Sequence, residues 1–112
     1  MNSVEIKLGY KGPYRDIKRA INRCYYNDRI LVHKGEYIAQ KDIFIGFDSQ
    51  IIGLSNRDSV KIKCHRDFGI NTNMQVMLKN VTITSSGITV HRSGILNANN
   101  CIFNNQDEET II

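Results

Sequence analysis

A repeat of about twenty residues near the end of the chain is the feature that most constrains its fold. Two segments, 77–83 and 97–103, each alternate apolar and polar residues, and Asn80 and Asn100 stand at equivalent places, twenty positions apart. A period of two puts side chains on opposite faces of a strand. Short strands that recur at this spacing between Asn, Gly and Ser turns indicate a parallel β-solenoid. We interpret Asn80 and Asn100 as a ladder of stacked amides at a left-handed bend.

The same alternation extends toward the N-terminus and predicts about three complete coils over residues 28–112, close to the minimum that buries a continuous core. A short opening strand is expected near Val4 and Ile6. One predicted sheet stacks residues 30–32, 60–64 and 88–90, and a second stacks residues 51–53, 77–80 and 96–100.

A change of period precedes the coils. Ile17, Ala20, Ile21 and Cys24 recur at helical spacing, with basic residues on the other side. This pattern predicts an amphipathic helix over about residues 14–24. Because a solenoid leaves an apolar end and unpaired strand edges at its first coil, we expect the helix to cap that end. Its basic side is interpreted as a solvated face.

Length and composition limit the class of protein. The 112 residues form one domain, 1–112, and a formal net charge of +4 with a pI near 9.1 suits an anionic partner as well as it suits plain solubility. Cys24, Cys64 and Cys101 are expected to be reduced, buried thiols. Their spacing gives no metal site, and no cofactor is expected. With neither a signal peptide nor a membrane span, we expect a cytoplasmic, intracellular protein.

A family resemblance rests on residues 27–37, which read Asn-Asp-Arg-Ile-Leu-Val-His-Lys-Gly-Glu-Tyr, between the helical Ile-x-x-Ala-Ile and Ile51-Ile52-Gly53. This order resembles the opening of pectin-lyase-like right-handed parallel β-helices. It is most similar to the repeats of the Shc SH2-domain-binding protein and Nessun dorma family and of the F-box β-helix proteins. Asn27 stands where the pattern has Gly. Asn also tolerates a left-handed backbone, so the turn is kept.

The resemblance covers about residues 14–103. It implies an all-β fold, a short right-handed parallel β-helix with an N-terminal amphipathic capping helix. It also implies carbohydrate binding or protein docking.

A basic residue follows each of the three histidines directly. If the predicted sheet of residues 30–32, 60–64 and 88–90 is in register, these pairs and two outward lysines form one positive stripe, which phosphate, sulfate or carboxylate groups would neutralise. The alternative is a merely solvated edge. The predicted anion stripe comprises His33, Lys34, Lys61, Lys63, His65, Arg66, His91 and Arg92.

The sequence gives less support for a catalytic site than for a binding surface. Asp42, Asp48, Asp58 and Asp67 fall singly in different turns, whereas acid–base or calcium-assisted cleavage of a polysaccharide needs grouped carboxylates. We therefore predict a non-catalytic binding or scaffold module for a protein or anionic glycan partner, and we do not expect a nucleic acid. The alternatives are a diminished polysaccharide lyase or glycoside hydrolase, and a purely structural assembly protein, for example a viral one.

The last residues of the sequence begin another predicted coil. Ile111 and Ile112, together with Phe103, would leave apolar side chains and strand edges at this end. We expect a homo-oligomer in which these three residues meet a second copy. Further coils of a longer protein would bury the same surface, and the sequence leaves both explanations open.

Overall fold

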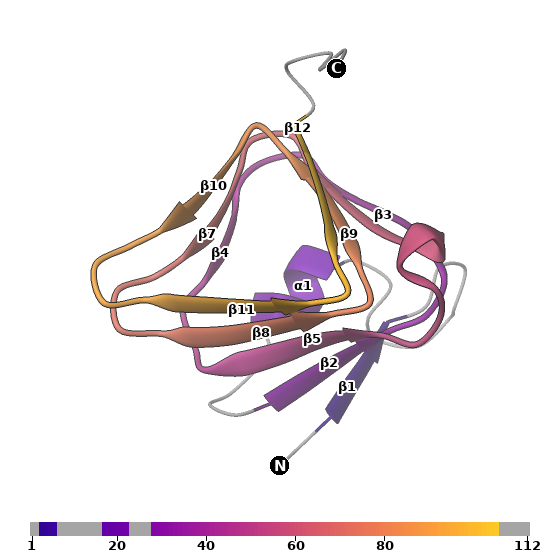
Figure 1. The fold of residues 1–112 in the computed structure, drawn as a ribbon, viewed down its shortest axis with the longest axis horizontal. Coiled ribbons are helices and arrows are strands. Elements are labelled where there is room, and N and C mark those ends of the chain that lie inside the picture. The colour runs from indigo at the N-terminus through magenta and orange to yellow at the C-terminus, as the bar shows by residue number, and fades with distance from the viewer. Residues whose placement is uncertain (1–2, 7–16, 23–27, 106–112) are drawn as a thin grey trace.

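Short strands and tight turns wind the chain into a right-handed parallel β-solenoid with a triangular cross-section (Figure 1). This computed structural model describes residues 3–6, 17–22 and 28–105. The strands are β1 (Ser3–Ile6), β2 (Asp28–Val32), β3 (Gly35–Ala39), β4 (Ile43–Ile45), β5 (Ser49–Gly53), β6 (Val60–Cys64), β7 (Asp67–Ile70), β8 (Gln75–Lys79), β9 (Thr82–Ser85), β10 (Gly87–Val90), β11 (Ile95–Asn99) and β12 (Ile102–Asn105).

Three strands make one coil, and each strand of a coil belongs to a different sheet. Sheet A has the order β1-β2-β5-β8-β11, sheet B the order β3-β6-β9-β12, and sheet C the order β4-β7-β10. Among the described residues three coils are complete, and β11 with β12 begins a fourth. The predicted fold class and coil number are therefore confirmed.

In-register stacking of aliphatic side chains fills the bore of the solenoid. On sheet A, Ile30 pairs with Ile51, which pairs with Leu78, and all three are buried. Sheet B contributes Tyr37, Ile62 and Ile83 in the same way. Burying one such side chain stabilises the fold by about 1.5–3 kcal/mol.

Only one of the two sheets predicted from the sequence is correct. The segments 51–53, 77–80 and 96–100 do stack, in sheet A. The predicted sheet of residues 30–32, 60–64 and 88–90 is wrong, because these segments lie in sheets A, B and C respectively. All three sheets alternate inward and outward residues with the same period, so alternation alone does not say to which sheet a strand belongs.

The expected N-terminal cap is present as helix α1 (Ile17–Asn22). Ile17, Ala20 and Ile21 are buried in the core, and α1 lies across the bore behind the first coil (Figure 1). The rest of the predicted helix, residues 14–16 and 23–24, lies outside the described residues. The opening strand β1 extends sheet A by pairing in parallel with β2.

The asparagine ladder is also confirmed. Asn80 and Asn100 both have positive φ, 57° and 54°, at the corner between sheets A and B. The Nδ2 of Asn100 donates to the Oδ1 of Asn80 at 2.9 Å. Asn is suited to this position because it tolerates left-handed backbone and can bond to the next amide.

The corner between β5 and β6 is longer than the equivalent corners of the other coils. It contains the 3₁₀ turn η1 (Arg57–Ser59). The backbone carbonyl of Arg57 accepts a hydrogen bond from the Thr82 hydroxyl at 2.8 Å. The side-chain Nη1 of Arg57 donates to the Oδ1 of Asn100 at 3.2 Å. The longer corner therefore contacts both the third and the fourth coil.

Gly53 ends β5 where two coils approach each other closely. A Cβ atom at this position would overlap the carbonyl oxygen of Asn80 in the next coil and press on Val60. Since the obstacle is backbone, a side chain here would push the coils apart.

We predict that Asn80→Ala destabilises the protein more than Asn80→Gly. Both changes remove the ladder bond, at about 0.5–1.5 kcal/mol, but alanine also meets the left-handed penalty of about 1–2 kcal/mol. Urea unfolding followed by circular dichroism measures both variants. Equal losses would contradict a role for the backbone conformation.

Gly53→Ala should cost about 1–3 kcal/mol of unfolding free energy, or more, because neighbouring coils must separate. Gly46→Ala is the matched control, since its Cβ would meet only the movable side-chain amide of Asn71, at 3.2 Å. The same denaturation experiment should find Gly46→Ala close to wild type. A Gly53→Ala protein as stable as this control would refute the close approach.

Candidate functional site

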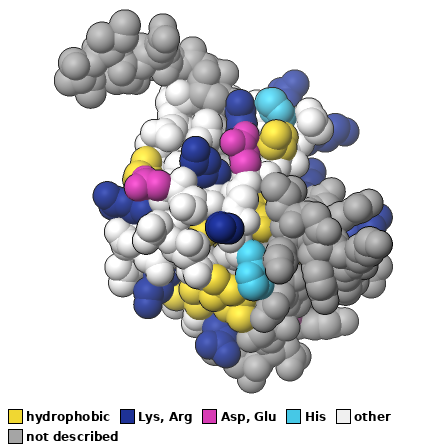
Figure 2. Space-filling view, turned by 90° about the vertical axis from the view of Figure 1, so that its right-hand side faces the viewer, with side chains coloured by type: hydrophobic (Ala, Val, Ile, Leu, Met, Phe, Trp, Pro, Cys, Tyr) yellow, Lys and Arg dark blue, Asp and Glu magenta, His cyan; other side chains and the backbone are white. Residues whose placement is uncertain are grey.

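The three His-base pairs of the predicted anion stripe lie at three different corners of the triangular cross-section. His33 and Lys34 lie between β2 and β3, His65 and Arg66 between β6 and β7, and His91 and Arg92 between β10 and β11. Figure 2, which faces the side of the molecule that carries β3 and β9, shows Lys and Arg side chains scattered over this side, some of them beside Asp or Glu side chains. One continuous stripe is therefore not formed, because its premise, a single sheet, is wrong.

The three histidines have different surroundings. The backbone carbonyl of the half-buried His33 accepts a hydrogen bond from the Tyr37 hydroxyl at 2.9 Å. The carbonyl of the exposed His65 accepts one from the Ser86 hydroxyl at 3.4 Å. The ring of His91 lies 6.1 Å from that of Phe44, tilted by 51°. The three imidazoles therefore do not lie at one site.

Lys61 and Lys63 are the two predicted residues that the structure keeps on one surface. Both project outward from β6 in sheet B, with Lys61 beside Thr82 and Lys63 beside Thr84 in the neighbouring strand β9. A shallow groove of about 220 Å³ runs over them; we call it the sheet B groove. It is lined by Glu36, Lys61, Lys63, Thr82, Thr84 and Asn104.

The charges of the sheet B groove are uneven. Lys61 has the carboxylate of Glu36 opposite it on β3, whereas the cross-strand neighbours of Lys63 are Ile38 and Thr84. The hydroxyl of Thr84 and the amide of Asn104 lie in line with Lys63 on the next two strands. Ammonium, hydroxyl and amide donors in one row suit an anion such as a sulfate or carboxylate.

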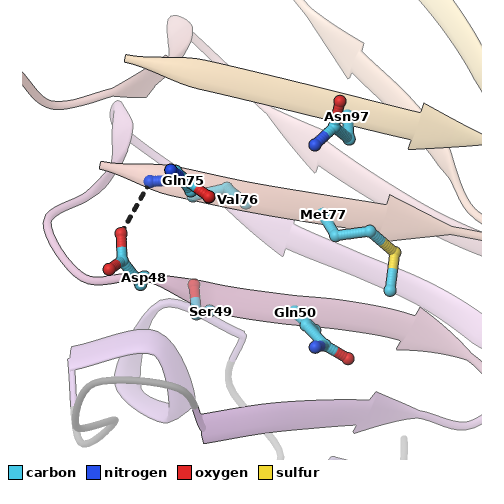
Figure 3. Close-up of a pocket in the computed structure, with 7 residues that line it drawn as sticks. All are labelled: Asp48, Ser49, Gln50, Gln75, Val76, Met77 and Asn97. Carbon is cyan, nitrogen blue, oxygen red and sulfur yellow. Dashed lines mark hydrogen bonds between the residues drawn. The ribbon is translucent and has the colours of Figure 1, made fainter. Parts of the chain in front are cut away.

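A second groove, on the outer face of sheet A, was not predicted from the sequence. Its volume is about 180 Å³, and Gln50, Met77 and Asn97 form its floor on three successive strands (Figure 3). Asp48 lies at one end, where its Oδ1 accepts a hydrogen bond from the backbone N–H of Gln75 at 2.7 Å. Amides both donate and accept hydrogen bonds, so this groove suits a neutral polar group. The only sequence signal was the polar outward positions of sheet A.

The turn carboxylates link successive coils. The carboxylate of Asp42 accepts a hydrogen bond from the backbone N–H of Asp67, one coil further on, at 2.9 Å. The carboxylate of Asp48 accepts the equivalent bond from Gln75. Within residues 3–6, 17–22 and 28–105, no group of three or more His, Cys, Asp or Glu side chains could hold a metal ion. In the same part of the chain, no helix is long and apolar enough to cross a membrane.

Two of the three cysteines lie in the described part of the chain, and both are free thiols. Cys64 is buried, and its Sγ donates to the carbonyls of Arg66 and Asp67 at 3.2 and 3.1 Å. Burial raises the pKa of the Cys64 thiol, and the nearby Asp42 and Asp67 carboxylates raise it further. This thiol is therefore a poor nucleophile. Cys101 is half-buried, and Cys24 lies outside the described residues.

The C-terminal end of the described solenoid exposes side chains that are buried one coil earlier. Ile88, Val90 and Phe103 are 40, 43 and 42% exposed, whereas their register partners Phe68, Ile70 and Ile83 are fully buried. The last strands of the three sheets, β10, β11 and β12, lie together at this end, which we call the end face. Of the predicted interface residues, Phe103 lies on the end face, and Ile111 and Ile112 lie outside the described residues.

Comparisons with known proteins do not assign a function to these surfaces. No family model matches the chain, and no solved structure matches it. The fold is therefore established by the geometry of the coils, and the family resemblance given above stays an interpretation of the sequence.

Proposed function

We propose that the protein is a non-catalytic binding or scaffold module that self-associates through the end face. The outer face of a sheet would then hold a protein or anionic glycan partner. The observation that carries self-association is the exposure of Ile88, Val90 and Phe103 beside the edges of three strands. Exposed apolar side chains next to unpaired strand edges favour contact with another chain.

Charge supports the same conclusion. Residues 93–105, which form the last described coil, contain no charged side chain, although charged residues make up 23% of the whole sequence. Soluble proteins commonly protect edge strands with lysine or other charges. An edge without this protection is suited to pairing.

We expect the purified protein to be oligomeric, with a mass that rises with concentration. The apolar end face is the physical reason, since burying it gains free energy of association. Sedimentation equilibrium or light scattering after size exclusion, over a wide concentration range, measures the mass. A monomer at the highest concentration would contradict self-association.

The sheet B groove favours an anionic partner as a second element of the proposal. Lys63 has two uncharged cross-strand neighbours and lies in line with the hydroxyl of Thr84 and the amide of Asn104. An extended polyanion lying along β6 would place one acidic group near each lysine. Compensation by Glu36 makes Lys61 the weaker of the two contacts.

The double variant Lys61→Glu with Lys63→Glu should bind immobilised heparin about tenfold more weakly than wild type, because two attractive contacts become repulsive. The control is Lys41→Glu with Lys79→Glu, which changes the net charge equally at two exposed lysines outside the groove. Affinities are measured at several salt concentrations, since contacts to a polyanion weaken with salt. Equal losses in both double variants would refute a specific role for the groove.

A further inference from the structure

The end face is a ramp. Along a solenoid each strand lies further along the axis than the one before it, so the rim rises from β10, in the third coil, through β11 to β12. Where β12 ends beside β10, the rim drops by the spacing of one coil, about 4.8 Å. Figure 1 looks onto this rim, with β11 along the base of the triangle and β10 and β12 meeting at the opposite corner.

The drop forms a hollow. A recess of about 190 Å³ lies between the raised strand β12 and the lower strand β10, lined by Ser85, Gly87, Ile88, Phe103, Asn104 and Asn105. Ile88 forms part of its floor and Phe103 part of its raised side. The recess therefore lies where a further strand of sheet C would stack on β10, above the exposed apolar side chains of that strand.

Building on the self-association proposed above, we propose that the end face binds the end face of a second copy across a two-fold axis. The axis passes through the middle of β11 and the corner where β12 and β10 meet. It lays β11 antiparallel to β11 of the other copy, and β12 antiparallel to β10. Because the ramp rises steadily along the chain, the high strand of each copy meets the low strand of the other, so the two ramps are complementary.

This arrangement brings apolar side chains together. Phe103 of each copy faces Ile88 and Val90 of the other, so the side chains that the last coil leaves exposed cover one another. A two-fold interface requires a surface to be complementary to itself, and β10, β11 and β12 carry no charged side chains that would repel their copies. Asn97, Asn99 and Asn100 add amide donors and acceptors along the edge.

The next residues of the chain are a less suitable occupant of the recess. If the twenty-residue register continued, residues 107–110 would stack on β10, with Glu108 over Ile88. A carboxylate facing the apolar bore is costly to bury. Strand β12 of a second copy brings Ile102 and Phe103 and no charge.

Head-to-tail stacking does not suit this molecule. The N-terminal end of the bore is covered by α1, whose Ile17, Ala20 and Ile21 are buried. Because only the C-terminal end is open among the described coils, the contact closes at two copies and builds no fibre.

A charge swap tests this geometry. Ile88→Lys and Phe103→Asp should each weaken the dimer at least about tenfold, because each buries two unpaired charges. The two changes combined in one chain should restore dimerisation, since the two-fold axis pairs each introduced lysine with an introduced aspartate. A mixture of the two single variants should form a heterodimer for the same reason. Ile38→Lys, at a 49% exposed position on β3, is the control and should dimerise as wild type does.

Sedimentation equilibrium measures the masses, and circular dichroism checks the fold of each variant. Where Ile88→Lys fails to fold, Val90→Lys replaces it in the same design. A dimeric wild type whose single variants dimerise equally well, or whose combined variant stays dissociated, would overturn the two-fold contact and leave self-association standing. A wild-type mass that keeps rising beyond that of a dimer would also overturn the two-fold contact and leave self-association standing. A monomeric wild type would overturn both proposals.

Discussion

The parallel register between successive coils is the constraint on which the rest of the structure depends. Backbone hydrogen bonds fix Ile51 between Ile30 and Leu78, and the same alignment sets every outward residue of sheet A. A shift of one residue would turn the aliphatic column outward and the polar column into the bore. The core, the corner asparagines and both grooves therefore have one common cause. The register also decides which lysines are neighbours.

Sequence reasoning recovered what is local or strictly periodic. The ladder of Asn80 and Asn100 was predictable because the last two coils have the same length and put the same residue at the same bend. The assignment of strands to sheets was not, because the coils differ in length: Ser49 pairs with Val76, 27 positions on, whereas Gln75 pairs with Ile95, 20 positions on. Placing residues 30–32, 60–64 and 88–90 in one sheet therefore predicted one common face for three histidines that lie at three corners. The sheet A groove was missed because outward Gln and Asn residues are ordinary in any exposed strand.

The proposals divide the surface of the molecule by chemistry. The strands of the end face carry no charged side chain and expose Ile88, Val90 and Phe103, so this face suits a second copy of the same chain. The sheet B groove carries Lys61 and Lys63 and stays on the side of the solenoid in such a dimer, so two grooves would be presented together. A multivalent polyanion would then engage both copies, and this raises the effective affinity beyond that of one groove.

The longer corner at η1 has a consequence for unfolding. A solenoid behaves as a one-dimensional array in which each repeat contacts only its neighbours, so its terminal repeats can fray separately. The contact from Arg57 to Asn100 joins the second coil to the fourth and skips the third. It adds a next-nearest-neighbour coupling to the array. The last described coil is thereby tied to the middle of the protein, which makes its loss more cooperative than its place at the rim would suggest.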